Sequence, residues 1–187
     1  MAVKSNLTNM VLVLGATCLL CSGILGGAYA LTKDPIDVAA KAKTLRAISE
    51  VLPPFTDADY NAENKYYKAT GDNGEVIGYA IESSTVGFGG TLTLMVGVTP
   101  DGTVYSTSVL SHSETPGLGA KCTTDRKFMS QWKGFTKNNN FSVKKEGGDV
   151  DAITASTITS GAYALAVSNA LKLFEEQGLG EVNEQED

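Results

Sequence analysis

The chain has 187 residues, a formal net charge of −6, three cysteines and a single histidine. An acidic chain without a dense basic cluster is not expected to bind nucleic acid. Only Cys122 lies outside the apolar N-terminal segment, which excludes an internal disulfide and a Cys- or His-rich metal site in the rest of the chain. With that segment set aside, about 150 residues remain, enough for one domain with a sizeable core.

The N-terminal segment is an apolar run of 22 residues, 10–31, without a charged side chain. About 20 such residues cross a bilayer as a helix, so the run predicts a transmembrane anchor behind a short tail at residues 1–9. A cleaved signal peptide is the second interpretation, because Ala28-Tyr29-Ala30 has the A-x-A form of a cleavage site. The positive-inside count of flanking lysines and arginines would place the C-terminal domain in the cytoplasm.

A second helix is predicted within residues 32–54, linking this segment to the domain. Asp34 is a good N-cap, and Pro35 suits the first helical position. Pro53-Pro54 ends the helical pattern. Apolar residues at helical spacing form one stripe: Val38, Ala42, Leu45, Ile48 and Leu52.

The domain is expected over residues 55–179, before an acidic tail at 180–187. Strands are predicted at 65–69, 75–83, 91–99, 103–111 and 141–145, and helices at 125–132 and 161–176. Leu92, Leu94, Val96 and Val98 alternate along one strand, which indicates a strand with one buried face. Hairpins bracketed by helices predict an α+β fold, with an antiparallel sheet flanked by helices.

Five hydroxyl side chains crowd the segment 154–160, directly before the last helix. Thr159 or Ser160 is the expected N-cap of that helix. The free N–H groups and positive dipole at a helix start suit an anion, above all a phosphate. By these residues alone, a simple cap on a core helix is the favoured interpretation, because Ser/Thr clusters are common before helices.

A second motif, His112-Ser-Glu-Thr-Pro-Gly-Leu-Gly119, joins the predicted sheet to the short helix. Pro116, Gly117 and Gly119 make it a tight loop whose backbone can approach a ligand closely. By its residues alone, however, it is also compatible with an ordinary turn. The single histidine is interpreted as structural, with a role as proton donor or hydrogen-bond partner of a ligand as the alternative.

Together these motifs resemble the FMN-binding domain shared by the G subunit of Rnf complexes and the C subunit of sodium-translocating NADH:quinone reductases. The segment 112–119 matches that family's His-x-Glu-Thr-Pro-Gly-Leu-Gly signature, and Gly87-Phe-Gly-Gly90 resembles its Gly-Tyr-x-Gly loop. The segment 151–157 resembles its flavinylation motif, Asp-x-x-Ser/Thr-Gly/Ala-Ala/Ser-Ser/Thr. Ala155 stands where glycine is commoner, and Ser156 where alanine is commoner.

The resemblance implies that FMN is joined by a phosphoester bond to Thr157, with Thr154 and Ser156 near the phosphate. It implies that the Glu114–Gly119 loop packs against the isoalloxazine. The expected contact residues in that loop are Glu114, Thr115, Gly117, Leu118 and Gly119. Asp151 belongs to the sequence that a flavin transferase would recognise, or else orders the loop as a simple carboxylate.

The expected protein is an electron-carrying component of an ion-translocating ferredoxin:NAD oxidoreductase complex, with the other Rnf subunits as partners and no independent catalysis. The family places the flavin domain outside the cytoplasm, against the prediction from flanking charge. The short chain favours the G subunit over the longer C subunit of the quinone reductases. A membrane-anchored binding or scaffolding module without flavin is the alternative.

Overall fold

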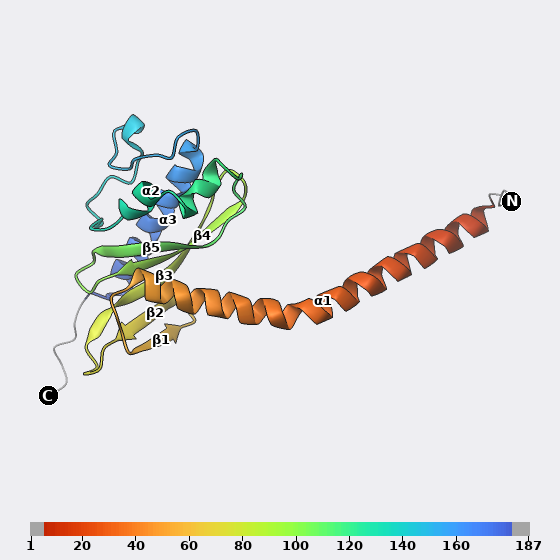
Figure 1. Ribbon diagram of the computed structural model, residues 1–187, viewed down its shortest axis with the longest axis horizontal. Coiled ribbons are helices and arrows are strands. Elements are labelled where there is room, and N and C mark those ends of the chain that lie inside the picture. Colours follow the sequence, from red (N-terminus) through yellow and green to blue (C-terminus); the bar gives the residue numbers. More distant parts are fainter. Residues whose placement is uncertain (1–5, 181–187) are drawn as a thin grey trace. The chain divides into compact units, whose positions relative to one another are not determined.

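A computed structural model describes residues 6–180 of the chain (Figure 1). The chain divides between Ala42 and Lys43 into two compact units. The elements are α1 (Leu7–Val51), β1 (Asp57–Asn61), β2 (Tyr66–Thr70), β3 (Val76–Val86), β4 (Thr91–Val98), β5 (Val104–Ser111), a 3-10 helix η1 (Gly119–Thr123), α2 (Arg126–Ser130), a 3-10 helix η2 (Lys144–Glu146) and α3 (Thr157–Glu176). Of the two predicted terminal tails, residues 1–5 and 181–187 lie outside the described residues.

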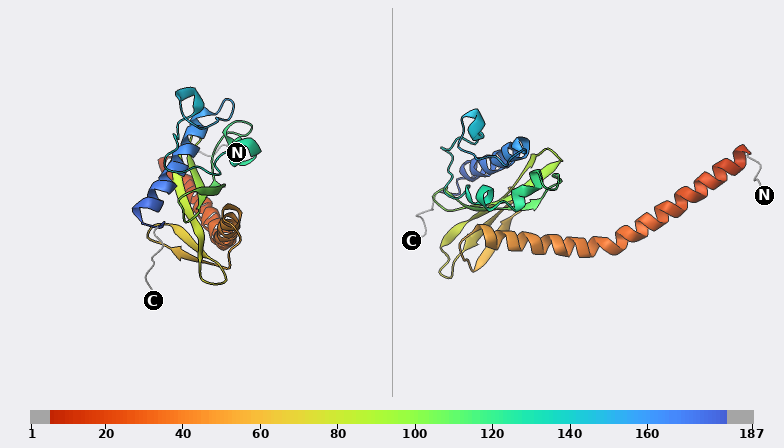
Figure 2. Two further views of the ribbon diagram at one scale, coloured as in Figure 1. Left: turned by 90° about the vertical axis from the view of Figure 1, so that its left-hand side faces the viewer. Right: turned by 45° about the horizontal axis from the view of Figure 1, so that its top comes forward.

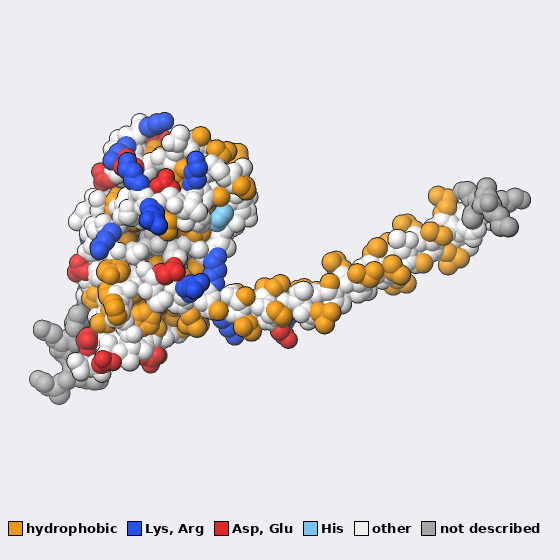
Figure 3. Space-filling view, viewed as in Figure 1, with side chains coloured by type: hydrophobic (Ala, Val, Ile, Leu, Met, Phe, Trp, Pro, Cys, Tyr) orange, Lys and Arg blue, Asp and Glu red, His pale blue; other side chains and the backbone are white. Residues whose placement is uncertain are grey.

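The long helix α1 contains the apolar N-terminal run and is long and apolar enough there to cross a membrane. Its side chains within residues 10–31 are exposed and, in the space-filling view, form an apolar surface without charge (Figure 3). The predicted new helix start at Asp34 is wrong, because α1 passes through Pro35 without ending. A proline inside a helix removes one backbone hydrogen bond and commonly kinks the helix, at a cost of about 3 kcal/mol, but it does not always end it.

The five strands form one antiparallel sheet in the order β1-β2-β3-β4-β5, so each strand pairs with its neighbour in sequence. Helix α3 covers one face of this sheet (Figure 2). Leu92, Leu94, Val96 and Val98 of β4 are fully buried in the core shared with α3. The predicted α+β class with an antiparallel sheet is confirmed.

The opposite face of the sheet is covered too, so the prediction that β4 has only one buried face is wrong. The last two turns of α1 bury Ala47, Ile48 and Val51 against Met95 of β4 and Ala80 of β3. This second core explains why the predicted linker helix carries an apolar stripe: the C-terminal residues of the stripe pack against the sheet. The C-terminal end of α1 is therefore part of the domain's core.

Three local predictions differ from the structure. Strand β1 was missed, because its sequence Asp-Ala-Asp-Tyr-Asn has little strand preference and pairs only through the register with β2. Residues 141–145 are not a strand: Val143 makes one bridge to Val150, and η2 follows. Asp149 accepts the Asn140 N–H at 2.8 Å and so competes with strand pairing there. Helix α3 begins at Thr157, four residues before the predicted start.

Candidate functional site

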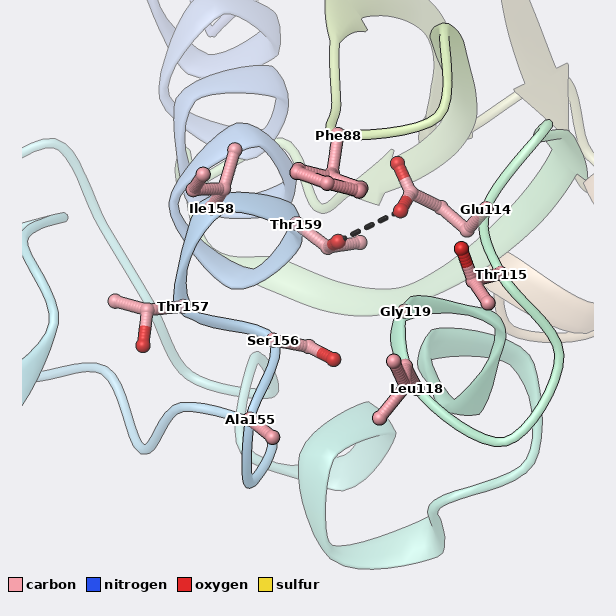
Figure 4. Close-up of a pocket in the computed structure, with 10 residues that line it drawn as sticks. All are labelled: Phe88, Glu114, Thr115, Leu118, Gly119, Ala155, Ser156, Thr157, Ile158 and Thr159. Carbon is pink, nitrogen blue, oxygen red and sulfur yellow. Dashed lines mark hydrogen bonds between the residues drawn. The ribbon is translucent and has the colours of Figure 1, made fainter.

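A pocket of about 370 Å³ opens where three chain segments meet: the loop after β3, the 112–119 motif and the start of α3. This volume lies within the usual range for small-molecule sites. Figure 4 shows the side chains arranged around it. The lining residues are Phe88, Glu114, Thr115, Leu118, Gly119, Ala155, Ser156, Thr157, Ile158 and Thr159.

The wall of the pocket is mainly apolar and accessible. Phe88, Ile158 and Leu118 are 70, 60 and 44% exposed, respectively, although all three are large hydrophobic residues. They come from three different segments and surround one opening (Figure 4). Exposed apolar side chains that converge on a pocket are typical of a site for a flat, largely apolar ligand group.

Glu114 connects the three segments from the inner side of the pocket and is buried. Its Oε2 accepts a hydrogen bond from Thr159 Oγ1 of α3 at 2.8 Å. Its Oε1 accepts one from the Gly89 N–H of the loop after β3 at 3.2 Å. A buried carboxylate must be hydrogen-bonded to be tolerated, and here the bonds also hold the pocket walls together.

The glycines around Glu114 are required by close packing. A Cβ on Gly119 would lie 2.4 Å from Glu114 Oε2 and 2.6 Å from Thr159 Oγ1. On Gly87 it would lie 2.1 Å from Glu114 Oε1. Any larger residue at either position would therefore displace the carboxylate from its two partners.

The 112–119 motif contains a tight turn and a hydrogen bond to the histidine side chain. The Leu118 N–H donates to the Thr115 carbonyl at 3.1 Å, and Gly117 has a φ of +78°. Proline then glycine at the two central positions is the pattern of a type II turn. His112 Nδ1 accepts the Glu114 N–H at 3.2 Å. The histidine does not line the pocket, so its contact supports a structural role.

Cys122 of η1 is buried below this motif. Burial, with the nearby Glu114 as a smaller cause, raises the pKa of its thiol from 9.0 to about 11. The neutral thiol form is therefore dominant at physiological pH, which makes Cys122 a packing residue and a poor nucleophile.

The start of α3 forms one side of the pocket through Ser156, Thr157, Ile158 and Thr159. The first N–H groups of a helix have no acceptor within it, and Ser156 at the N-cap position makes no side-chain cap bond. Thr157 is the first helical residue and is exposed. In Figure 4 it lies at the rim, and its hydroxyl points away from Glu114 and Leu118. Among residues 6–180, that hydroxyl has no hydrogen-bond partner.

The segment before α3 is held in place by bonds from both sides. The Gln131 side chain accepts the Asp151 N–H at 2.8 Å and donates to the Asp151 carbonyl at 3.2 Å. The Ile153 N–H donates to Ser160 Oγ at 2.9 Å. The Asp151 carboxylate pairs with Lys144 Nζ at 2.9 Å, which lowers the pKa of the carboxyl group. Thr157 is thus presented on a well-fixed backbone.

Ala155 has a φ of +61°, in the left-handed region that favours glycine. A non-glycine residue there is strained by about 1–2 kcal/mol, partly offset because glycine is more flexible when unfolded. We expect Ala155→Gly to stabilise the domain by about 0.5–1 kcal/mol, measured by denaturant unfolding of the full chain in detergent. The matched control is Gly117→Ala, at a φ of +78° in open space, which should destabilise. A less stable Ala155→Gly chain would contradict this explanation.

The structure brings together six of the predicted cofactor-contact residues. Two others lie elsewhere: Thr154 is exposed in the turn before Ala155, and Gly117 is at the tip of the 115–118 turn, and neither lines the pocket. The expected N-cap role of Thr159 or Ser160 is wrong, because both lie inside α3. The six predicted residues at the pocket are Glu114, Thr115, Leu118, Gly119, Ser156 and Thr157.

Sequence reasoning did not name three of the lining residues as contacts: Ala155, Ile158 and Thr159. Ala155 was noted only as a position of the 151–157 motif. Ile158 follows Thr157 within the motif but carries no chemical signal. Thr159 was interpreted only as a cap, although its hydroxyl binds Glu114. The glycine loop at 87–90, which resembles the family's Gly-Tyr-x-Gly loop, contributes to the pocket through Phe88.

The site suits a flavin nucleotide, because a mainly apolar pocket of about 370 Å³ adjoins the start of a helix, where a phosphate binds favourably. The Ser156 Oγ, buried in the wall without a partner, also indicates a missing polar ligand atom. The fold and site thus define an FMN-binding domain, and residues 87–172 match the family described as "FMN-binding domain". A crystal structure of the C subunit of the Na(+)-translocating NADH-quinone reductase from Parabacteroides distasonis is similar, with a TM-score of 0.50 and 26% identity over 63% of each chain.

Relatives that match over most of the chain identify the family more narrowly than the domain does. The chain is 31% identical to the G subunit of the ion-translocating oxidoreductase complex of Methanosarcina acetivorans, over 91% of this chain and 96% of that one. It is 33% identical to the G subunit of the proton-translocating ferredoxin:NAD(+) oxidoreductase complex of Clostridium ljungdahlii, over 91% and 89%. The chain therefore belongs to the G-subunit family of ion-translocating oxidoreductase (Rnf) complexes. The predicted family, and its Rnf branch over the quinone-reductase branch, are confirmed.

Proposed function

We propose that this chain is the electron-carrying G subunit of a membrane-bound ferredoxin:NAD oxidoreductase of the Rnf type, with FMN joined covalently to Thr157. The observation that carries the proposal is the position of Thr157, an exposed hydroxyl at the first residue of α3 and at the rim of an apolar pocket. Membership of the G-subunit family supports the redox role. The other subunits of the complex are the partners, and no independent catalysis on a soluble substrate is expected.

FMN supplies the redox chemistry, because a flavin accepts and releases one or two electrons, and the protein positions it. The N–H groups of the first turn of α3 stabilise the negative charge that a phosphodiester on Thr157 retains. Phe88, Leu118 and Ile158 provide the apolar walls for the isoalloxazine, and Glu114 holds these walls together. Thr115 and Gly119 complete the pocket.

Thr154 and Gly117 act indirectly in this proposal. Thr154 belongs to the exposed turn that presents Thr157, and Gly117 allows the tight turn that places Leu118. Asp151 is the contact for the flavin transferase during maturation. Its exposed carboxylate, paired with Lys144 and fixed through its backbone by Gln131, is accessible and well oriented for such recognition.

We further propose that the domain lies on the extracytoplasmic side, anchored through residues 10–31. A covalent bond would be an advantage there, where lost FMN could not be replaced. The lysines and arginine directly after the anchor favour the opposite orientation.

One experiment on the natural host tests these points together. Mass spectrometry of the mature chain should show the added mass of one FMN on the peptide that contains Thr157, and an intact N-terminal segment. Protease added to intact cells, with the outer membrane opened where there is one, should digest the domain. A bare Thr157 peptide would exclude the electron-carrier proposal, and a fully protected domain would exclude the proposed side.

A further inference from the structure

The Ser156 hydroxyl is the unusual polar group of the pocket. Ser156 is only 7% exposed, and its Oγ is buried without a hydrogen-bond partner. Among residues 6–180, the one other buried side-chain atom in this condition is Trp132 Nε1, which is not part of the pocket. In Figure 4 the Ser156 hydroxyl points into the pocket toward Leu118. A buried hydroxyl without a partner is unfavourable, which calls for an explanation in a native site.

The neighbouring hydroxyls do find hydrogen-bond partners, so the local backbone does not force a hydroxyl here to remain unpaired. Thr159 Oγ1 donates to Glu114, and Ser160 Oγ donates to the Ser156 carbonyl. A serine at an N-cap ordinarily accepts a hydrogen bond from an N–H of the first turn. Ser156, with a φ of −140° and a ψ of 46°, makes no such bond. Its hydroxyl is directed into the pocket instead.

None of the other polar side chains of the pocket, Thr115 included, binds the Ser156 hydroxyl, which is therefore free to donate. The Glu114 carboxylate and the Thr159 hydroxyl bind each other. Phe88, Leu118 and Ile158 offer only apolar surface. Thr157 lies at the rim with its oxygen directed away, so a phosphate attached there would lie outside the space that Ser156 faces. Of the other two parts of FMN, the flat isoalloxazine matches the apolar surfaces around Ser156 better than the hydroxylated ribityl chain does, so the ring is the part that we assign to this space.

We propose that Ser156 Oγ donates a hydrogen bond to an acceptor atom of the isoalloxazine and thereby raises the reduction potential of the flavin. The proposal rests on the function proposed above. Reduction increases the electron density on the ring acceptors, and a hydrogen-bond donor stabilises the form with more negative charge.

The test compares full-length chains purified in detergent from a host that also makes the flavin transferase. In Ser156→Ala, the equilibrium between oxidised and reduced flavin should shift at least tenfold toward the oxidised form, which is about 59 mV for a one-electron couple. Ser156→Thr should retain most of the wild-type potential. Thr124→Val, which removes an exposed hydroxyl outside both the pocket and the 151–157 motif, is the matched control and should leave the potential unchanged.

A second readout uses chains from a host without the transferase. There Ser156→Ala should raise the melting temperature by roughly 3 °C, because it removes an unpaired buried hydroxyl. A Ser156→Ala chain that carries FMN on Thr157 at the wild-type potential would overturn this inference and leave the proposed function intact. A wild-type chain without FMN would overturn both. An unchanged potential in Ser156→Ala with a raised melting temperature would also count against the ring contact.

Discussion

Replacing Thr157 with valine is expected to reduce covalently bound FMN to background. Valine has nearly the shape of threonine but no Oγ, so the phosphoester bond cannot form. The fold should be unaffected, because Thr157 is exposed and its hydroxyl has no partner among residues 6–180. Surface substitutions of this kind change the free energy of unfolding by within about 0.5 kcal/mol. In-gel flavin fluorescence after denaturation, in a host with the flavin transferase, measures the result.

Two controls make this result specific. Thr157→Ser keeps a hydroxyl and should stay fluorescent if the transferase accepts serine. Thr124→Val removes an exposed hydroxyl that lies outside the 151–157 motif and does not line the pocket, and it should stay fully fluorescent. A Thr157→Val band as bright as wild type would show that another residue carries the flavin.

Replacing Glu114 with alanine is expected to destabilise the domain by about 3 kcal/mol and to loosen the pocket. The change leaves the Thr159 hydroxyl and the Gly89 N–H without their acceptor. An unsatisfied buried polar group costs about 1–3 kcal/mol, and the removed side chain leaves a cavity in addition. Denaturant unfolding of the full chain measures the stability. Quenching of the attached flavin by iodide should increase, because the loop after β3 is no longer bound to α3.

Glu114→Gln separates hydrogen bonding from charge. Its amide oxygen can accept the Gly89 N–H, while its amide nitrogen can donate to Thr159 Oγ1, since a hydroxyl both donates and accepts. We therefore expect stability within about 1 kcal/mol of wild type and an unchanged pocket. If Glu114→Gln were as unstable as Glu114→Ala, the negative charge itself would be the required feature. Equal stability of all three chains would show that Glu114 does not hold the pocket together.

Much of this protein could be predicted from short stretches of sequence, because the responsible interactions are local. The run 10–31 is apolar and uncharged over 22 residues, and this composition alone predicts that it can cross a bilayer. The hairpin of β4 and β5 follows from the alternating side chains on either side of the turn Pro100-Asp101-Gly102. The threonine-rich motif and the 112–119 signature were recognised as motifs, which located the pocket before any contact was known.

Only the tertiary structure decided which of these residues act together. Glu114 binds Gly89 and Thr159, which are 25 and 45 residues away, and no local pattern reports such a distance. The end of α1 covers the second face of the sheet, and β1 forms although its sequence hardly favours a strand, because burial and pairing outweigh local preference. Whether a hydroxyl faces solvent, a neighbour or the pocket depends on the backbone angles that packing imposes. For that reason Thr154 and Ser156 look alike in the sequence, but only Ser156 faces the site.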